Sequence, residues 1–279
     1  MRLLRIIFYK LIKYKFLNII LQNLKFHFRF NRRFRKTVFG FKFKGSNAMI
    51  NGSFEKKETL FFNKYISNYE VFINIGANVG YYVLNALNSN KKINVIAFEP
   101  IINNYKLLIK NVSINNFNNR VKAENIALGN KNKIVKIYGN TTGASLIKGW
   151  ANNPVNSFEK VKLYKLDTFL SIKKINLLRK KTFMMIDVEG FELEVLKGAK
   201  SMLKDVKPTL FVEICNGEHF EKNDKLFYEN FNFLNKIGYE SYVFDVDSLI
   251  SFKPDLKNKL MTHNFIFIHK HSVNYFEKT

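Results

Sequence analysis

The sequence of 279 residues contains a single cysteine, Cys215. One thiol excludes an intrachain disulfide and a zinc site built on cysteines, and such sparing use of cysteine fits a reducing compartment, here the cytoplasm. The N-terminus also lacks an apolar run close to the ~20 residues that a membrane-spanning helix needs, because lysines interrupt it. We therefore expect neither a signal peptide nor a spanning helix there.

Acidic residues are absent from the first 54 positions, which contain thirteen of the Lys and Arg residues. The formal net charge of the whole chain is +24, so this fifth of the sequence carries more than half of the excess. A basic segment of this kind normally binds phosphate groups, either on nucleic acid or on an anionic lipid surface. Lys and Asn are abundant throughout, and an A/T-rich coding sequence explains the basicity elsewhere equally well.

Residues 1–45 are interpreted as a basic amphipathic segment. Leu4, Ile7, Phe8 and Leu11 recur at helical spacing, with basic residues on the opposite side. A helix of this kind can lie in a membrane interface, here the cytoplasmic face of the membrane. The alternative is that its apolar stripe packs on the folded domain.

From residue 71 onward, short β-rich runs alternate with stretches of helical spacing. This alternation predicts parallel βαβ units, and therefore a single α/β domain over residues 46–279. The runs Tyr239–Phe244 and Phe265–Ile268 have no helix between them, so we expect an antiparallel pair at the edge of the sheet.

Several local expectations follow from the same patterns. Val121–Leu128 is expected to form one strand, with Ile134–Tyr138 as its hairpin partner, and Lys162–Leu166 a further strand. The apolar spacing from Val195 to Leu203 predicts one helix. Residues 139–157 are predicted to form a long loop, either a substrate lid or a surface excursion.

A glycine turn after the first buried strand carries the most chemical information. Val71–Gly80 reads V-F-I-N-I-G-A-N-V-G, and Glu99 ends the next strand. In doubly wound sheets, ligands bind outside the carboxyl ends of the strands, where the strand order reverses. Gly76 and Gly80 allow a sharp turn, and Glu99 can accept hydrogen bonds from both hydroxyls of a ribose.

The spacing of this turn separates two nucleotide cofactors. A dinucleotide-binding turn reads G-x-G-x-x-G, whereas here the pattern is G-x-x-x-G and Asn78 stands where a second glycine would be. An asparagine there would obstruct a pyrophosphate, but it can hydrogen-bond the amino-acid part of S-adenosylmethionine. The pattern favours the methyl donor; the alternative is a turn that serves folding alone.

Seven motifs, in order, resemble those of the FkbM-type methyltransferase family. They are I-N-I-G-A-N-V-G at 73–80, A-F-E-P at 97–100, N-I-A-L-G at 125–129, L-D-T-F at 166–169, I-D-V-E-G-F-E at 186–192, V-L-K-G-A at 195–199 and P-T-L-F-V-E-I at 208–214. The resemblance implies the class I methyltransferase fold, a Rossmann-like three-layer α/β arrangement whose mostly parallel sheet has an antiparallel edge strand. It also implies S-adenosylmethionine as cofactor and O-methylation of a glycan, another carbohydrate or a small-metabolite hydroxyl.

The motifs also place the expected site residues. Those expected to bind the cofactor are Asn74, Gly76, Asn78, Gly80, Glu99 and Asn125. Asp187 and Glu189 are expected to take the proton of the acceptor or to orient it. Their alternative is structural, as carboxylates that accept backbone N–H groups at a helix start. Glu213 is a weaker candidate for substrate binding, and no metal site is expected.

Two departures from the family pattern leave other functions open. The family usually has Asp where Asn74 stands, facing the ammonium group of the cofactor, and commonly has Lys in the place of Met185. These departures allow a catalytically impaired, cofactor-binding relative with a membrane-associated role. The net charge also raises the possibility of a nucleic-acid-binding protein. No module pattern supports it, and the N/D-P-P-Y/F-type strand end is absent, so nucleic acid is not the expected partner.

Overall fold

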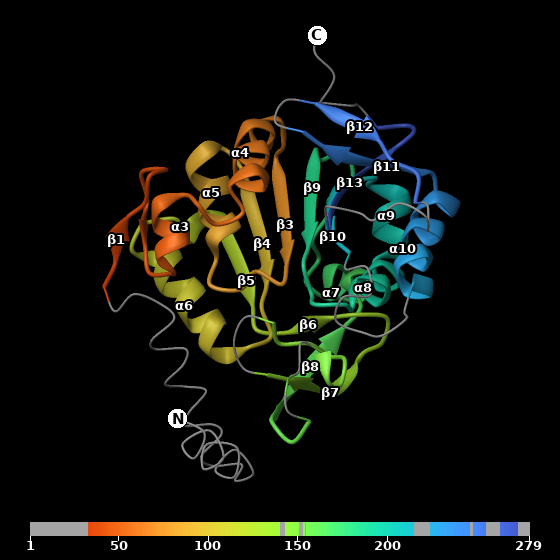
Figure 1. Cartoon of the computed structure of the whole chain (residues 1–279), viewed down its shortest axis with the longest axis horizontal. Helices are drawn as coiled ribbons and strands as arrows, with labels where there is room; N and C mark the ends of the chain where they lie inside the picture. Colours follow the sequence, from red (N-terminus) through yellow and green to blue (C-terminus); the bar gives the residue numbers. More distant parts are fainter. Residues whose placement is uncertain are drawn as a thin grey trace, which may run out of the picture.

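The computed structural model describes residues 33–139, 143–150, 153, 155–214, 224–245, 248–254 and 263–272. Within them, a central sheet of eight strands lies between two layers of helices, and a sheet of three strands lies at one end (Figure 1). The expected amphipathic stripe from Leu4 to Leu11 lies outside the described residues, as do residues 216–223 of the loop after Glu213.

The strands in the described residues are β1 (Arg35–Lys36), β2 (Lys42–Phe43), β3 (Val71–Ile75), β4 (Asn94–Phe98), β5 (Val121–Glu124), β6 (Ala127–Leu128), β7 (Lys133–Tyr138), β8 (Phe158–Tyr164), β9 (Thr182–Ile186), β10 (Thr209–Glu213), β11 (Tyr239–Phe244), β12 (Leu249–Ser251) and β13 (Asn264–His269). The helices are α3 (Asn47–Asn51), α4 (Lys56–Tyr65), α5 (Tyr81–Ser89), α6 (Ile102–Ser113), α7 (Leu166–Ile172), α8 (Glu192–Gly198), α9 (Lys200–Asp205) and α10 (Asp224–Lys236). Two short 3-10 helices cover Ile66–Asn68 and Asn118–Arg120.

The central sheet has the strand order β12-β11-β13-β10-β9-β3-β4-β5. Strands β3, β4, β5, β9 and β10 are mutually parallel, and the order reverses between β3 and β9. Strand β13 is antiparallel to both β10 and β11, so the predicted mostly parallel sheet with an antiparallel edge pair is confirmed. Strand β12 extends that edge by one more strand.

Two apolar cores cover the faces of the central sheet. Because successive side chains of a strand point to opposite faces, Phe72 packs with α4, α5 and α6, whereas Ile73 and Ile75 pack with α7 to α10. Phe41 and Phe43 are 3% and 0% exposed in the first of these cores. The packed domain therefore begins before the boundary expected at residue 46.

After β4, the structure differs from three of the expectations drawn from the sequence. The run at 121–128 forms two strands, of which β5 joins the central sheet and β6 the small one. Strand β7 pairs with β8 rather than with that run, and β8 ends at Tyr164, so that Leu166 begins α7. The physical reason for the break is Asn125, whose amide donates to the carbonyl oxygens of Glu99 and Pro100 at 2.8 and 2.9 Å and turns the chain out of the sheet.

The single helix expected through 195–203 is broken at Ala199 into α8 and α9. Asp167 accepts hydrogen bonds from two backbone N–H groups in the first turn of α9, at 2.9 Å each, which favours a new helix start there. A Cβ on Gly198 would collide with the carbonyl oxygen of Gly129. Two of the seven motifs, at 125–129 and 195–199, therefore meet in one packing contact, and a third, at 166–169, binds the start of α9.

Asn74 and Met185 are register partners on β3 and β9, and they are 2% and 5% exposed. Partners on adjacent strands project from the same face of the sheet, here the face covered by α5. The two positions that depart from the FkbM pattern are therefore neighbours, and Asp and Lys in these places would be adjacent opposite charges.

We therefore expect the two positions to be coupled energetically. Asn74→Asp alone should lower the free energy of unfolding by about 2 kcal/mol or more, because it buries a carboxyl group without a cation. Adding Met185→Lys should recover at least half of that loss. Urea denaturation of both single variants and the double variant measures the coupling, and strictly additive effects would contradict the contact.

Candidate cofactor and acceptor site

A pocket opens at the carboxyl ends of β3, β4 and β9, where the strand order reverses. Its empty space amounts to about 650 Å³, a figure that includes the open solvent at its mouth. Its walls come from the glycine turn, the start of α6, strand β6 and the segments at 143–146 and 187–191. None of the described lining residues is Lys or Arg.

The glycine turn is shaped by the protein's own backbone. Gly76 has a φ of +85°, and a Cβ there would collide with the carbonyl oxygen of Asp187. The backbone N–H of Asp187 donates to the carbonyl oxygen of Ile75 at 3.0 Å, so the ends of β3 and β9 are tied together. Gly80, with a φ of +89°, precedes α5. Both predicted glycines thus occupy conformations that side chains disfavour.

Glu99 is the buried carboxyl group of the pocket, 4% exposed. It accepts hydrogen bonds from the backbone N–H groups of Asn78 and Ile101, at 2.8 Å each. Burial raises the pKa of Glu99 to about 7, and these hydrogen bonds oppose the rise. Asn104 Nδ2 donates a third, longer hydrogen bond at 3.4 Å, so one of the four lone-pair sites of the carboxylate is left for a ribose hydroxyl.

Asn104 is a pocket residue that the sequence analysis missed. It is 2% exposed, its Nδ2 donates to Glu99 at 3.4 Å, and its Oδ1 has no hydrogen-bond partner in the described structure. The signal was present, because Asn104 occupies an apolar position of α6 beside Leu108.

Two residues expected to bind the cofactor do not line this pocket. Asn125 braces the backbone that follows β4, as described above, and so positions Glu99. Asn74 lies within β3 on the α5 side of the sheet. Their direct contact with a cofactor stays a prediction, whereas Gly76, Asn78 and Glu99 all line the pocket.

Glu189 connects the pocket to the predicted loop. Its carboxylate accepts a hydrogen bond from Trp150 Nε1 at 2.8 Å, and its carbonyl oxygen accepts one from Ser145 Oγ at 2.7 Å. The Trp150 ring covers Gly190 so closely that a Cβ there would collide with it. Gly143, Ala144 and Leu146 line the pocket, so this part of the predicted loop forms one of its walls.

Asp187 lines the pocket at the end of β9, with Glu213 at the end of the adjacent strand β10. Burial, followed by the negative charges of Glu213 and Glu189, raises the pKa of Asp187 well above its usual range. A hydrogen bond between the Asp187 and Glu213 side chains contributes to this rise. Glu55 lies close enough to add to it. Within the described residues, no cluster of His, Cys, Asp and Glu is arranged to hold a metal ion.

Comparison with solved structures finds proteins of similar architecture at low identity. An FkbM methyltransferase from Methylobacillus flagellatus KT is 17% identical over 80% of this chain and 53% of its own, with a TM-score of 0.45. This chain therefore spans about half the length of that protein. An O-methyltransferase from Bacillus cereus, solved in complex with SAH, is 13% identical over 76% of this chain and 80% of its own, with a TM-score of 0.44.

None of the curated proteins matches this sequence. The Methyltransferase FkbM domain matches residues 74–241, which is more than half of the chain and includes the glycine turn, Glu99 and the Asp187–Glu213 pair. This match confirms the resemblance drawn from the seven motifs, and with it the expected methyl donor, S-adenosylmethionine. The chain belongs to the FkbM methyltransferase family.

Proposed function

We propose that this protein transfers a methyl group from S-adenosylmethionine to a hydroxyl group of a carbohydrate or glycan. The observation that carries the proposal is the gathering of carboxyl groups beside the pocket: Asp187, Glu189, Glu213 and Glu55. Carboxylates accept hydrogen bonds from hydroxyl groups, and they repel phosphate. A sugar therefore fits this side of the pocket better than a nucleic acid does, despite the net charge of the chain.

The pocket also fits the cofactor, which when bound supplies an electrophilic methyl group on a positively charged sulfur. Glu99 offers a buried carboxylate to the ribose hydroxyls, and Asn104 offers the unpartnered Oδ1 to a further donor. Phe98, Ile126 and Leu128 provide apolar walls for a flat ring. Because none of the described lining residues is Lys or Arg, the pocket suits a ligand without phosphate.

Asp187 and Glu213 are proposed to handle the proton of the acceptor. Burial and the neighbouring negative charges raise the pKa of Asp187 well above its usual range, so we assign Asp187 to orienting the acceptor. We assign to Glu213, at the end of the adjacent strand, the role of accepting the hydroxyl proton during transfer. Glu189 is engaged by Trp150, and we assign it to holding the loop over the pocket.

The pKa of Glu99 predicts how cofactor binding depends on pH. Ribose hydroxyls donate to the carboxylate form, so ligand binding should favour deprotonated Glu99. Affinity for S-adenosylhomocysteine should be full above pH 7 and should fall about tenfold per pH unit below the pKa of about 7. Titration calorimetry between pH 5.5 and 8 measures this.

Glu99→Gln should weaken binding at pH 8 and abolish the dependence on pH. Glu192→Gln is the matched control, because Glu192 is a buried carboxyl group with a pKa raised by burial to about 8 that does not line the pocket. Its amide oxygen can keep the hydrogen bond from the Gly190 N–H. If Glu99→Gln kept the pH dependence of the wild type, Glu99 would not contact the ligand.

Removing the proposed proton acceptor should slow turnover without weakening cofactor binding. Glu213→Gln should slow methyl transfer roughly 100-fold or more, as is typical for loss of a general base. Affinity for S-adenosylhomocysteine should stay within about twofold, because Glu213 does not line the cofactor pocket. The measurement is an untargeted mass-spectrometric comparison of glycans from cells with the wild type, without the protein, and with the variant.

Cells without the protein and cells with Glu213→Gln should lack the same methyl group. Cells with the control variant Glu194→Gln, which removes the carboxylate that pairs with Lys197, should retain it. Identical glycans in all four strains would remove the glycan proposal. Cofactor binding with no turnover on any acceptor would instead favour the impaired relative that Asn74 and Met185 suggested.

Membrane contact through residues 1–45 is a second part of the proposal. It rests on the thirteen basic residues and the absence of acidic ones in that stretch. Among the described residues, no helix is long and apolar enough to cross a bilayer. The contact that we propose is a peripheral one. A surface-bound enzyme would lie close to lipid-linked glycan precursors.

Substitution tests this contact better than truncation, because Phe43 belongs to the packed core. Replacing Arg2, Arg5, Lys10 and Lys13 by Gln in the full chain should sharply reduce co-sedimentation with anionic vesicles at low salt. Each basic residue near such a surface contributes about 1 kcal/mol. Equal sedimentation of variant and wild type would contradict membrane contact and leave the methyl transfer untouched.

A further inference from the structure

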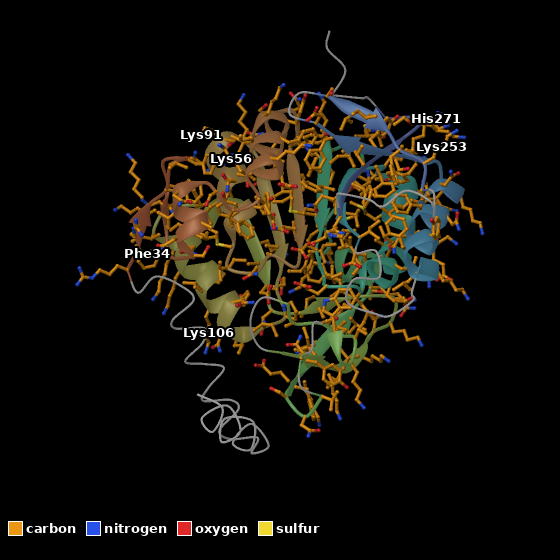
Figure 2. All side chains as sticks on the ribbon, in the orientation of Figure 1. Phe34, Lys56, Lys91, Lys106, Lys253 and His271 are labelled. Carbon is orange, nitrogen blue, oxygen red and sulfur yellow. The ribbon has the colours of Figure 1, made fainter. Side chains whose placement is uncertain are left out.

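One side of the molecule combines a short hairpin with the outward side of a helix. We call it the α6–hairpin face and define it by residues 33–44 and by Ile102, Lys106, Ile109 and Lys110 of α6. The hairpin is fixed at the C-terminal end of α6, because Asn111 accepts from the Lys44 N–H at 2.8 Å and donates to its carbonyl oxygen at 3.1 Å. Asn115, just after the helix, binds the backbone of Lys42 in the same way, at 2.8 and 2.7 Å. Figure 1 shows the hairpin and α6 on the same side, and Figure 2 labels Phe34 and Lys106 there.

The charge of this face has a single sign. Residues 33–54 contain five Lys and Arg residues, residues 100–123 contain four, and neither stretch contains Asp or Glu. The acidic residues that follow these stretches are already engaged. Glu55 accepts a hydrogen bond from Tyr82 at 2.7 Å, and Glu124 pairs with Lys173 at 3.4 Å. Within the described part of the chain, none of the Lys and Arg residues of the α6–hairpin face forms an ion pair.

Apolar side chains are exposed between the basic ones. Ile102 and Ile109 are 36% and 38% exposed, and they lie with Lys106 on one stripe of α6 at helical spacing. Phe34 is 39% exposed on the hairpin. A purely phosphate-binding surface gains nothing from exposed isoleucine and phenylalanine, whereas a bilayer interface buries such side chains while its headgroups meet the lysines.

The position of the face connects it to the pocket and to the N-terminal stretch. Ile101 and Asn104 line the pocket at the start of α6, directly beside the exposed Ile102. The chain enters the face at Arg33, and the 32 residues before it contain eight further Lys and Arg residues and no acidic ones. Positive charge thus continues along the sequence from the N-terminal stretch into the hairpin of the α6–hairpin face.

We propose that the α6–hairpin face docks on an anionic phospholipid bilayer, with the pocket mouth at the start of α6 beside the headgroups. The folded domain itself would then be a membrane-binding element, in addition to the N-terminal segment. The benefit for catalysis, access to a hydroxyl acceptor held at the membrane, rests on the function proposed above.

The test uses the full chain and vesicles of phosphatidylglycerol and phosphatidylcholine in equal parts. Lys106→Gln/Lys110→Gln should lower the partition coefficient about 30-fold, which is roughly fivefold for each basic residue near the surface. The matched control is Lys200→Gln/Lys204→Gln, an exposed pair at the same spacing on α9, across the sheet. This control should bind vesicles within about twofold of the wild type.

Ile109→Asp tests the apolar part of the face and should also reduce vesicle binding. Equal losses of vesicle binding in the two double-lysine variants would show that only net charge matters and would overturn the proposal. Unchanged vesicle binding in the α6 variant would overturn it as well. A loss of bulk RNA binding without a loss of vesicle binding would assign the face to nucleic acid instead. All variants should bind S-adenosylhomocysteine like the wild type, so failure here would be distinguishable from failure of the proposed methyl transfer.

Discussion

The carbonyl oxygen of Asp187 fills the space that a side chain on Gly76 would need, and the arrangement of the site depends on this contact. It brings the end of β3 against the end of β9, where the strand order of the sheet reverses. Asp187 is thereby held at the pocket wall next to the glycine turn, while the neighbouring strand β10 delivers Glu213 beside it. A larger residue at position 76 would separate the two strand ends and, with them, the cofactor side and the acceptor side of the site.

The protein separates its charges by location. Positive charge lies on the surface, and within the described residues the Lys and Arg side chains of the α6–hairpin face form no ion pair, whereas the pocket and its surroundings contain carboxyl groups without a described cation. Burial raises the pKa values of Glu99 and Asp187, so these groups weaken the folded state when ionised. Carboxyl groups whose pKa values are raised in this way are typical of functional sites. A ligand with a positive charge and hydroxyl donors would stabilise them in the ionised form.

The sequence predicted the parts of the structure that depend on local pattern. The glycine turn, the alternation of strands and helices and the antiparallel edge pair can each be read from neighbouring residues. The small sheet could not be read in this way, because 121–128 has the length and pattern of one strand. Its break depends on Asn125, whose amide donates to carbonyl oxygens at the end of β4. The partnership of Asp187 with Glu213 was hidden for the same reason, since only the parallel register of β9 and β10 brings them together.

The most direct test of the account is a comparison of two cofactors by thermal unfolding of the full chain. A ligand that binds only the native state adds about 2.7 kcal/mol of stability at a hundredfold excess over its Kd. The account predicts that S-adenosylmethionine raises the melting temperature by the corresponding amount and that NADH has no effect, because the turn has Asn78 where a pyrophosphate would need glycine. Stabilisation by NADH and not by S-adenosylmethionine would contradict it.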